Sequence, residues 1–481
     1  MARRSKWVRQ ADGSHCPVEE LRLVVDITSS GSNRRIRVRD LIKQPGPPEA
    51  RLILGRSQRL APTGKLCYFK SDVSKCHQRI LRSQGDRRFS VVSPSPGRNY
   101  IGNVGDFGGS SSAYWAGRLM AIPHRLVFHW IQILEIWQLL YADDTMVAAP
   151  IQCIWVVVTM WTFFMSLVGM PLSWHKLAIG LSIEWLGHLL LGNVYALGIA
   201  DSRRAQVIHD LSELLKCTFV SPFMIQRSAH VWAWVAQVIE PVRPFLGPLF
   251  TFLHGGPLRR RVQMPHVVRM ALSALLHFAV RAGSFRPMET KSPSKCSCYA
   301  DASAMDGAIR LGGWFGEAGC TKDAAYWFVG TLTPDRHPWA LAGRSLTAVV
   351  FVTEMLAPLV LARALAQVFP GILAETCLNV HTDSQSAEAS VNNMYSKSIP
   401  GLCVLFAMAS EQLASESLLR LRWIPRELNE WADQLSRHDS NGFSQQLHVH
   451  VNMDFDEVLA FWNIFQHPIG QAMDVGEVIV L

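Results

Sequence analysis

The stretch Tyr141-Ala142-Asp143-Asp144 places two adjacent carboxylates between two largely apolar runs, Trp137–Leu140 and Met146–Ala149. An apolar run, a short polar turn and a second apolar run predict a β-hairpin with the acids at its tip. Two neighbouring like charges are costly to bury unless a cation or water faces them. The stretch therefore indicates either a divalent-metal site or an ordinary solvated turn, and taken alone it favours the turn, because Asp is a common turn residue.

An acid upstream favours the metal site. Leu66-Cys67-Tyr68-Phe69 is typical of a short strand, and it runs into Asp72, which lies 71 residues before Asp143. The two acids can meet if their strands pair. Between them, Phe107-Gly108-Gly109-Ser110-Ser111-Ser112 leads into a helical pattern at 113–120, where serines can cap the helix and glycines let the backbone approach a ligand.

In this order the segments resemble the first three core motifs of a reverse-transcriptase palm: an acid at a strand end, a Gly/Ser loop that opens a helix, and Tyr-x-Asp-Asp. Pro171-Leu172-Ser173-Trp174-His175-Lys176 resembles the segment that carries the palm lysine, and Glu184-Trp185-Leu186-Gly187-His188 resembles the primer-grip hairpin. The resemblance covers most of residues 30–440.

The resemblance implies that Asp72 and Asp143 hold two Mg²⁺ ions, for which Mn²⁺ is an alternative, with Asp144 in a supporting role. Lys176 would bring charge or a proton to the pyrophosphate, and a solvated lysine is an equal alternative. His77 stands where the family usually has an aromatic residue that excludes the ribose 2′-hydroxyl, so sugar discrimination stays open. The residues implied to contact substrate are His77, Gly108, Gly109, Ser110, Tyr141, Arg34, Arg35 and Arg37.

A second group of acids lies in the C-terminal half. Its members and the elements expected to carry them are Asp301 at the end of a short strand, Glu354 on an apolar helix from Leu346 to Val368, Asp383 after the strand Leu378–Thr382, and Asp433 on the compact helix Asn429–Arg437. Pro358 predicts that the long helix is kinked or split. An ionisable side chain is unusual in so apolar a stretch, so the position of Glu354 needs an explanation.

Asp, Glu, Asp and Asp on a strand, a helix, a strand and a helix resemble the ribonuclease H active site. The resemblance implies that these four acids bind two Mg²⁺ ions and hydrolyse the RNA of an RNA–DNA hybrid. Each acid also has an ordinary alternative: Asp383 can cap the next helix, Asp433 can lie on a solvated face, and Glu354 can pair with Arg363.

The loop before the last acid departs from the cellular enzymes, which usually present a histidine there. Here the loop is Trp423-Ile424-Pro425-Arg426-Glu427, and Arg426 is a partial substitute for the histidine. The segment Ile424–Asn429 is more similar to the ribonuclease H of retroelements, including tyrosine-recombinase retrotransposons.

Charge is unevenly distributed along the 481 residues. The formal net charge is +9, yet residues 1–100 carry 21 Lys and Arg against 8 Asp and Glu. This basic end, densest at Arg34, Arg35, Arg37 and Arg39, is expected to hold a phosphate backbone, and a solvated or disordered arm is the alternative. Ten cysteines without zinc-site spacing predict reduced thiols in an intracellular protein, in the nucleus or the cytoplasm.

The segment Thr145–Trp174 contains 30 residues without a charged side chain or histidine, which is long enough to span a membrane. Gln152, Thr159, Thr162 and Ser166 recur on one helical face, which favours instead a helix that packs on a sheet and shows water its polar side. Pro150 and Pro171 limit that helix to about 20 residues.

We therefore expect an α+β and α/β multidomain protein: a reverse-transcriptase palm with reduced fingers and a helical thumb, followed by a ribonuclease H-like α/β domain. The expected segments are 1–60 (reduced basic fingers), 61–195 (palm), 196–255 (thumb), 256–293 (connection), 294–440 (ribonuclease H-like domain) and 441–481 (a tail of unknown role).

The expected function is an RNA-directed DNA polymerase with linked ribonuclease H, encoded by a retroelement. Its partners would be an RNA template, a DNA primer, an RNA–DNA hybrid and deoxynucleoside triphosphates, without a membrane. A decayed or repurposed copy that binds nucleic acid without catalysis is the first alternative. A membrane-associated protein with accidental acidic motifs is the second.

Overall fold

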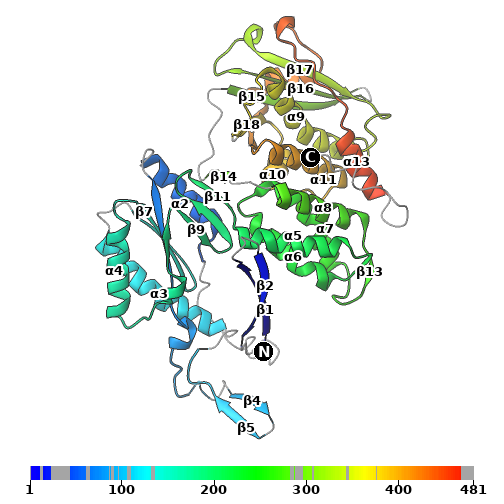
Figure 1. Ribbon diagram of the computed structural model, residues 1–481. Coiled ribbons are helices and arrows are strands. Elements are labelled where there is room, and N and C mark those ends of the chain that lie inside the picture. Colours follow the sequence, from blue (N-terminus) through cyan, green and yellow to red (C-terminus); the bar gives the residue numbers. More distant parts are fainter. Residues whose placement is uncertain are drawn as a thin grey trace. The chain divides into compact units, whose positions relative to one another are not determined.

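The computed structural model shows a mixed α/β protein with several sheets (Figure 1). It divides into two compact units, Met1–Gln206 with Pro287–Glu289 (unit 1) and Val207–Arg286 with Thr290–Leu481 (unit 2). The residues that the structure describes are 2–10, 15–22, 44–60, 65–85, 87, 91–95, 97–105, 110–131, 136–281, 286–287, 296–305, 308–342, 346–374 and 376–466.

The central sheet of unit 1 contains the predicted hairpin. Its strand order is β6-β7-β3-β8, with β6 (Trp137–Tyr141), β7 (Asp144–Pro150), β3 (Leu66–Asp72) and β8 (Ala178–Gly180) all antiparallel to their neighbours. The strands that carry the predicted acids therefore pair directly, as the sequence predicted.

Helices α3 (Ser110–Trp130) and α4 (Ile154–Leu167) pack on one face of this sheet and form its core with β3 and β7 (Figure 1). Trp161 of α4 is fully buried, and its indole N–H donates to the Ser71 hydroxyl at 2.9 Å. Since side chains alternate along a strand, Ser71 on the helix side places Asp72 on the opposite face. The candidate acid thus lies on the face that α3 and α4 leave uncovered.

The smaller elements of unit 1 include the hairpin that resembles a primer grip. Strands β9 (Ser182–Trp185) and β10 (His188–Leu191) pair through a two-residue turn, Leu186-Gly187, in which both φ angles are positive. The remaining elements are β1 (Ala2–Arg9), β2 (His15–Arg22), α2 (Pro47–Leu60), η1 (Cys76–Arg79), β4 (Val91–Ser95), β5 (Arg98–Ile101), η3 (Trp174–Lys176) and β11 (Ala196–Ile199).

Unit 2 contains a five-stranded mixed sheet in the order β17-β16-β15-β18-β19. The strands are β15 (Cys296–Met305), β16 (Ala308–Glu317), β17 (Tyr326–Leu332), β18 (Cys377–Thr382) and β19 (Leu418–Trp423). The first three are antiparallel, whereas β18 is parallel to both β15 and β19. Asp301 therefore lies inside a ten-residue strand, and the expectation that it ends a short strand was wrong.

Helix α9 (Leu346–Val368) spans the predicted range and packs on β15 and β16. It continues through Pro358, so the expectation of a split helix was wrong. Pro358 only removes the N–H that would bond the carbonyl of Glu354, and packing on the sheet outweighs that loss. The other helices are α5 (Asp201–Leu215), α6 (Pro222–Val235), α7 (Arg243–His254), α8 (His266–Arg281), α10 (Gln385–Asn393), α11 (Ile399–Ala414), α12 (Glu430–Ser436) and α13 (Asp456–Gln466).

Contacts within unit 2 join its helices to its sheet. Phe245 of α7 stacks on Phe406 of α11 with ring centroids 5.0 Å apart. Arg420 of β19 forms a half-buried ion pair with Glu240. Helices α6 to α8 are thus part of the same compact body as the mixed sheet.

The uncharged segment 145–174 forms a strand and the 14-residue helix α4, which is too short to cross a membrane. Thr159 and Ser166 are exposed and Thr162 is half-buried, as predicted, but Gln152 precedes the helix, and the exposed side also carries apolar side chains: Trp155, Val156, Phe163 and Leu167. Among the described residues, only α9 is long and apolar enough to span a membrane, and 78 % of its apolar window is buried inside the protein.

Helix α12 lies unusually close to β16, because Gly312 of this strand faces it without a side chain. A Cβ at Gly312 would come within 2.2 Å of the Ser436 backbone nitrogen and 2.4 Å of the Leu435 carbonyl carbon. Backbone atoms cannot yield as a flexible side chain can. This close approach sets the distance between α12 and Asp301, which pairs with Gly312 across the strands.

We predict that Gly312→Ala lowers the free energy of unfolding by about 1–3 kcal/mol, since α12 must move away from the sheet. Gly85→Ala, at an exposed turn position, is the control, because a Cβ there would meet no atom within 4 Å outside its chain neighbours. Urea unfolding of both variants measures the difference. Equal stability of the two variants would contradict the close packing.

Two candidate metal centres

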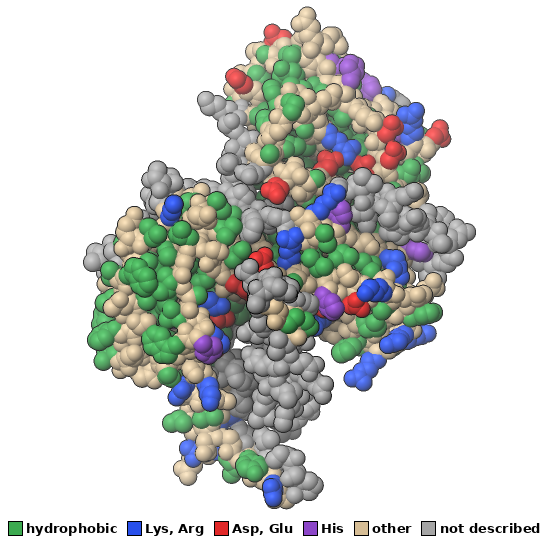
Figure 2. Space-filling view, viewed as in Figure 1, with side chains coloured by type: hydrophobic (Ala, Val, Ile, Leu, Met, Phe, Trp, Pro, Cys, Tyr) green, Lys and Arg blue, Asp and Glu red, His purple; other side chains and the backbone are tan. Residues whose placement is uncertain are grey.

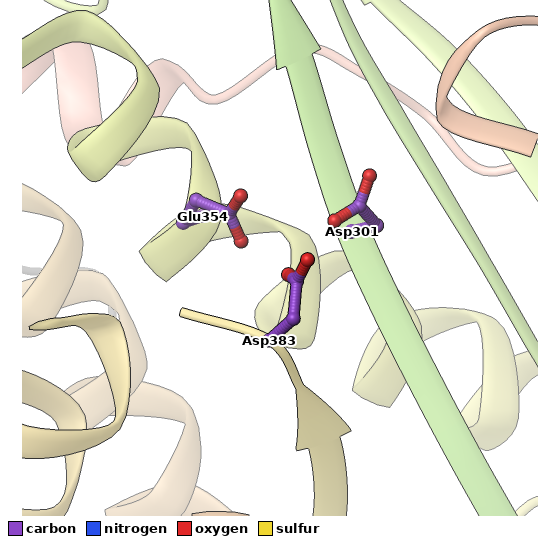
Figure 3. A group of neighbouring side chains, drawn as sticks. All are labelled: Asp301, Glu354 and Asp383. Carbon is purple, nitrogen blue, oxygen red and sulfur yellow. The ribbon is translucent and has the colours of Figure 1, made fainter. Parts of the chain in front are cut away.

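Three acids of unit 2 converge from separate elements. Asp301 comes from β15, Glu354 from α9 and Asp383 from the residue after β18, and their carboxylates point toward one another (Figure 3). One oxygen from each lies within 4.8 Å of the other two. Three of the four acids predicted for this centre are thus brought together.

Burial makes this cluster electrostatically unusual. Asp301 is 4 % exposed and Glu354 is 7 % exposed. Burial, together with the neighbouring Asp383 and Asp433 carboxylates, raises the pKa of Asp301 to about 7, against a hydrogen bond from Ser436 that lowers it. Burial and the charges of Asp301 and Asp383 raise the pKa of Glu354 well above its usual range. A cation would relieve this repulsion.

The donor set fits a metal ion. The Oε2 atom of Glu354 is buried without a hydrogen-bond partner among the described residues. Arg363, proposed as an alternative partner for Glu354, binds Glu411 and Glu457 instead. Asp383 does not cap α10, because the Ser384 hydroxyl accepts the Ala387 N–H in that role. Neither ordinary alternative therefore accounts for these two acids.

Asp433, the fourth predicted ligand, lies apart from that group. Its Oδ1 accepts hydrogen bonds from Arg426 and Arg437, each at 2.8 Å. Arg426, expected as a partial substitute for a histidine, therefore holds the last acid. The charge of Asp433 still reaches Asp301, whose pKa it helps to raise.

Residues around α12 that the sequence did not single out support the cluster. Asn429 is 1 % exposed and donates to the Ala300 carbonyl at 3.4 Å, next to Asp301. The Ser303 hydroxyl donates to the Ser436 carbonyl at 2.6 Å and ties β15 to the end of α12. Only the tertiary approach of α12 to β15 brings these residues near the site, so no local pattern could have indicated them.

In unit 1 the hairpin brings together Asp72, Asp143 and Asp144. In the register of β3 and β7, Asp72 pairs with Asp144. Asp143 lies in the two-residue turn Ala142-Asp143 between β6 and β7, where the φ angle of Ala142 is 53°. Paired residues of antiparallel strands point to the same face. The cross-strand pair is therefore Asp72 with Asp144, and the leading role expected of Asp143 stays a prediction.

Lys176 supplies the positive charge of this second centre. Its ammonium forms an ion pair with Asp72, which is almost fully buried. The Ser173 N–H also bonds the Asp72 carbonyl at 2.8 Å and fixes the lysine segment beside β3. Lys176 is thus both exposed to solvent and paired with Asp72, and its role at the pyrophosphate stays a prediction.

The charges of the acids in unit 1 affect the pKa values of their neighbours. Burial raises the pKa of Asp144, Lys70 and Lys176 lower it, and Asp143 and Asp72 raise it further. Burial and the same two aspartates raise the pKa of the Cys76 thiol to about 12. Among described side chains, however, a group of three donors within 4.8 Å of one another occurs only at Asp301, Glu354 and Asp383.

Several predicted substrate contacts lie outside the described residues: Arg34, Arg35, Arg37, Gly108 and Gly109. Ser110 begins α3 and His77 lies in η1, but their side chains are not described. Tyr141 ends β6, is half-buried and pairs with Asp144 across the hairpin. Of this group, the structure therefore places only Tyr141 beside the acids.

A buried histidine behind the hairpin connects α3 to both of its strands. His124 Nε2 lies 2.8 Å from the Thr145 hydroxyl, and Nδ1 lies 2.6 Å from the Gln138 amide nitrogen. Its ring packs edge-on against Trp161 at 4.5 Å. Burial lowers the pKa of His124 to about 3. Thr145, the residue that follows Asp144, is therefore hydrogen-bonded to a neutral imidazole.

Comparison with known proteins finds likeness in structure alone. No protein-family model matches the sequence, and no curated protein matches it. Three solved structures of a foamy viral protease-reverse transcriptase are similar to the chain. A dRH form with double-stranded DNA has 11 % identity and a TM-score of 0.41, covering 88 % of this chain and 65 % of the other.

The second structure, also with double-stranded DNA, has 12 % identity and a TM-score of 0.39. The match covers 87 % of this chain and 77 % of the viral chain. The third, with an RNA/DNA hybrid, has 11 % identity and a TM-score of 0.40, and 88 % of this chain covers 50 % of it. The chain thus spans between half and about three quarters of the length of these viral proteins.

We predict that acid lowers the contribution of His124 to the stability of unit 1. Because the pKa of His124 is about 3 when folded and near the ordinary 6.5 when unfolded, the unfolded chain binds more protons at this group between these values. The contribution is therefore fully present above pH 6.5 and falls by on the order of 1.4 kcal/mol per pH unit as the pH drops toward 3. Asp301 of unit 2, whose pKa burial raises to about 7, changes stability in the opposite direction over most of the same pH range.

Denaturant unfolding at pH 7, 6, 5 and 4 checks this expectation. Relative to the wild type, His124→Leu should lose less stability on acidification, with the remaining pH dependence due in part to His188, whose pKa burial also lowers, to about 4. His129→Leu, an exposed position on the same helix, is the matched control and should keep the wild-type slope. Parallel slopes for all three proteins would exclude this role of His124.

Proposed function

We propose that the chain is an RNA-directed DNA polymerase with a linked ribonuclease H, encoded by a retroelement. The observation that carries this proposal is the convergence of Asp301, Glu354 and Asp383 from a strand, a helix and a strand end. The mixed sheet supports it, because β15 and β18, which carry Asp301 and lead into Asp383, are neighbours, and α9 brings Glu354 against β15.

Asp301, Glu354 and Asp383 would hold Mg²⁺ in unit 2, and Glu354 Oε2 is the free acceptor that such an ion requires. When bound, the ions would activate water and stabilise the departing 3′-oxygen of the RNA strand. Arg426 and Arg437 both form ion pairs with Asp433 and can hold the phosphate that is cleaved. For Asp433 to act as a further ligand, both arginines must release it.

The polymerase activity would lie in unit 1. Asp72 and Asp144, paired across β3 and β7, would hold Mg²⁺ together with Asp143 at the tip of the hairpin. Lys176 would move from Asp72 to the triphosphate once the ions bind, because the same lysine cannot serve both partners. Tyr141 lies at the end of the neighbouring strand, where it can contact the incoming nucleotide.

A copy that binds nucleic acid without catalysis is the second candidate. Three ion pairs favour it: Lys176 binds Asp72, and Arg426 and Arg437 both bind Asp433. These ion pairs stabilise the protein without a metal ion. His77, in place of the usual aromatic residue, points in the same direction.

We predict a separation of the two activities by single substitutions. With Mg²⁺, Asp72→Asn should abolish primer extension on an RNA template and spare cleavage of an RNA–DNA hybrid. Asp301→Asn should do the reverse, with cleavage reduced at least about 100-fold, since even residues behind the ligands cost 10–100-fold. Asp335→Asn, an exposed acid of unit 2, is the control and should keep both activities.

Gel assays of labelled primer and labelled RNA measure both reactions on the same preparations. Absence of extension by the wild-type chain would remove the polymerase proposal, and absence of cleavage would remove the ribonuclease proposal. Absence of both, with nucleic-acid binding retained, would establish the second candidate.

A further inference from the structure

An exposed basic corner lies in unit 2 on the loop between α7 and β13 (Val262–Gln263). All residues from His254 to Arg261 are exposed, and three consecutive arginines, Arg259, Arg260 and Arg261, end the loop. We call these arginines, together with Phe219, Phe223 and Leu258, the arginine corner. None of these six residues belongs to either acidic centre.

The corner is fixed by backbone hydrogen bonds. Strand β12 (Phe219–Val220) pairs with β13, so that Phe219 faces Gln263 and Val220 faces Val262. The Phe223 N–H donates to the Leu258 carbonyl at 2.9 Å. The arginine loop is therefore held at both ends against the segment that carries the two phenylalanines.

Large apolar side chains of the corner are unusually exposed. Phe219 is 57 %, Phe223 is 60 % and Leu258 is 51 % exposed. Phe219 shares its face of the β12–β13 pair with Gln263, and Arg261 directly precedes β13. Val220 and Val262 point to the other side, where Val220 is fully buried. The exposed rings and the arginine run thus lie along one edge of the protein, joined by the β12–β13 pair and the Phe223–Leu258 hydrogen bond.

The described part of the chain does not neutralise the positive charge of the corner. Among the described residues, no acid forms an ion pair with Arg259, Arg260 or Arg261, whereas nearby Lys216 binds Glu213 at 2.6 Å. Figure 2 shows Lys and Arg side chains beside exposed hydrophobic ones around the part of the chain that Figure 1 labels β13. Three guanidinium groups without an ion-pair partner among the described residues favour the binding of an anionic ligand.

We propose that the arginine corner binds single-stranded nucleic acid. Guanidinium groups contact phosphates, and exposed aromatic rings stack on unpaired bases, which is the combination that single-strand sites use. Paired bases in a duplex hide their faces from such rings, so phenylalanines at this position favour a single strand. The identity of the ligand rests on the proposed function, because a copying enzyme handles unpaired template.

An acidic protein surface would satisfy the arginines but would leave Phe219 and Phe223 without a partner. For that reason the combination of charge and aromatic rings favours nucleic acid. Competition by polyglutamate distinguishes the two ligands: it should displace a single strand only weakly, and displacement as effective as that by unlabelled strand would overturn the proposal.

The test measures binding of a fluorescent single-stranded oligonucleotide of roughly 15 nucleotides to the full chain by anisotropy, in EDTA over a range of salt concentrations. Arg259→Gln/Arg260→Gln should reduce the slope of log affinity against log salt by about 1.4, since each phosphate contact contributes about 0.7 for a single strand. Arg336→Gln/Lys397→Gln removes the same charge from exposed positions outside the corner and should leave the slope nearly unchanged.

A second variant tests the stacking. Phe219→Ala/Phe223→Ala should weaken binding of the single strand roughly 5-fold or more, with little change in the salt slope and in binding of a duplex of equal length. Tyr395→Ala, an exposed aromatic residue of unit 2, is the matched control. Both phenylalanines are exposed, so thermal unfolding should be unchanged.

Equal slopes for the arginine variant and its control, or equal loss of single strand and duplex in the phenylalanine variant, would overturn the proposal. Because EDTA removes divalent metals, these outcomes are independent of catalysis. A protein without either enzymatic activity could still confirm the arginine corner, and an active enzyme could still refute it.

Discussion

Repulsion among two buried carboxylates and a third that is half-buried is the constraint on which unit 2 depends. Asp301, Glu354 and Asp383 would each be more stable in water, yet the fold holds their oxygens within 4.8 Å of one another. Desolvation and like charge both oppose ionisation there, which is why the pKa of Asp301 rises to about 7. Such an arrangement persists only if the surrounding structure enforces it and a cation completes it.

The surrounding structure does enforce it. Asp301 is fixed in mid-strand between β16 and β18, Glu354 lies on a helix buried in the core, and Gly312 lets α12 close against the same strand. The acids of unit 1 are handled differently, because Lys176 supplies a positive charge to Asp72 within the fold. The two centres thus differ in their ion pairs. In unit 1 a lysine binds Asp72 directly, whereas in unit 2 Arg426 and Arg437 bind Asp433, and no described cation forms an ion pair with Asp301, Glu354 or Asp383.

Local patterns in the sequence predicted much of this arrangement. Alternating and apolar runs identified the hairpin of β6 and β7, and helical periodicity identified the bounds of α9. The sequence could not show the register that sets Asp72 opposite Asp144, because a two-residue turn removes Asp143 from the strand and its alternation. Register depends on pairing between segments distant in the chain.

Tertiary contacts explain the other differences. Arg426 precedes Asp433 by seven residues, and only the geometry of the intervening turn lets it reach that acid. Pro358 was expected to interrupt α9, but burial of the whole helix against the sheet outweighs one lost hydrogen bond. Asn429 and Ser436 act through the approach of α12, which no single segment specifies.

Thermal unfolding of the full chain and of Glu354→Gln at an alkaline pH, where Glu354 is ionised despite its raised pKa, each with EDTA and with Mg²⁺, tests the need for a cation most directly. Removing one of three repelling acids should raise the melting temperature in EDTA and should diminish the stabilisation that Mg²⁺ gives the wild-type protein. A lower melting temperature of Glu354→Gln in EDTA, together with equal stabilisation of both proteins by Mg²⁺, would contradict a cluster built to receive a cation.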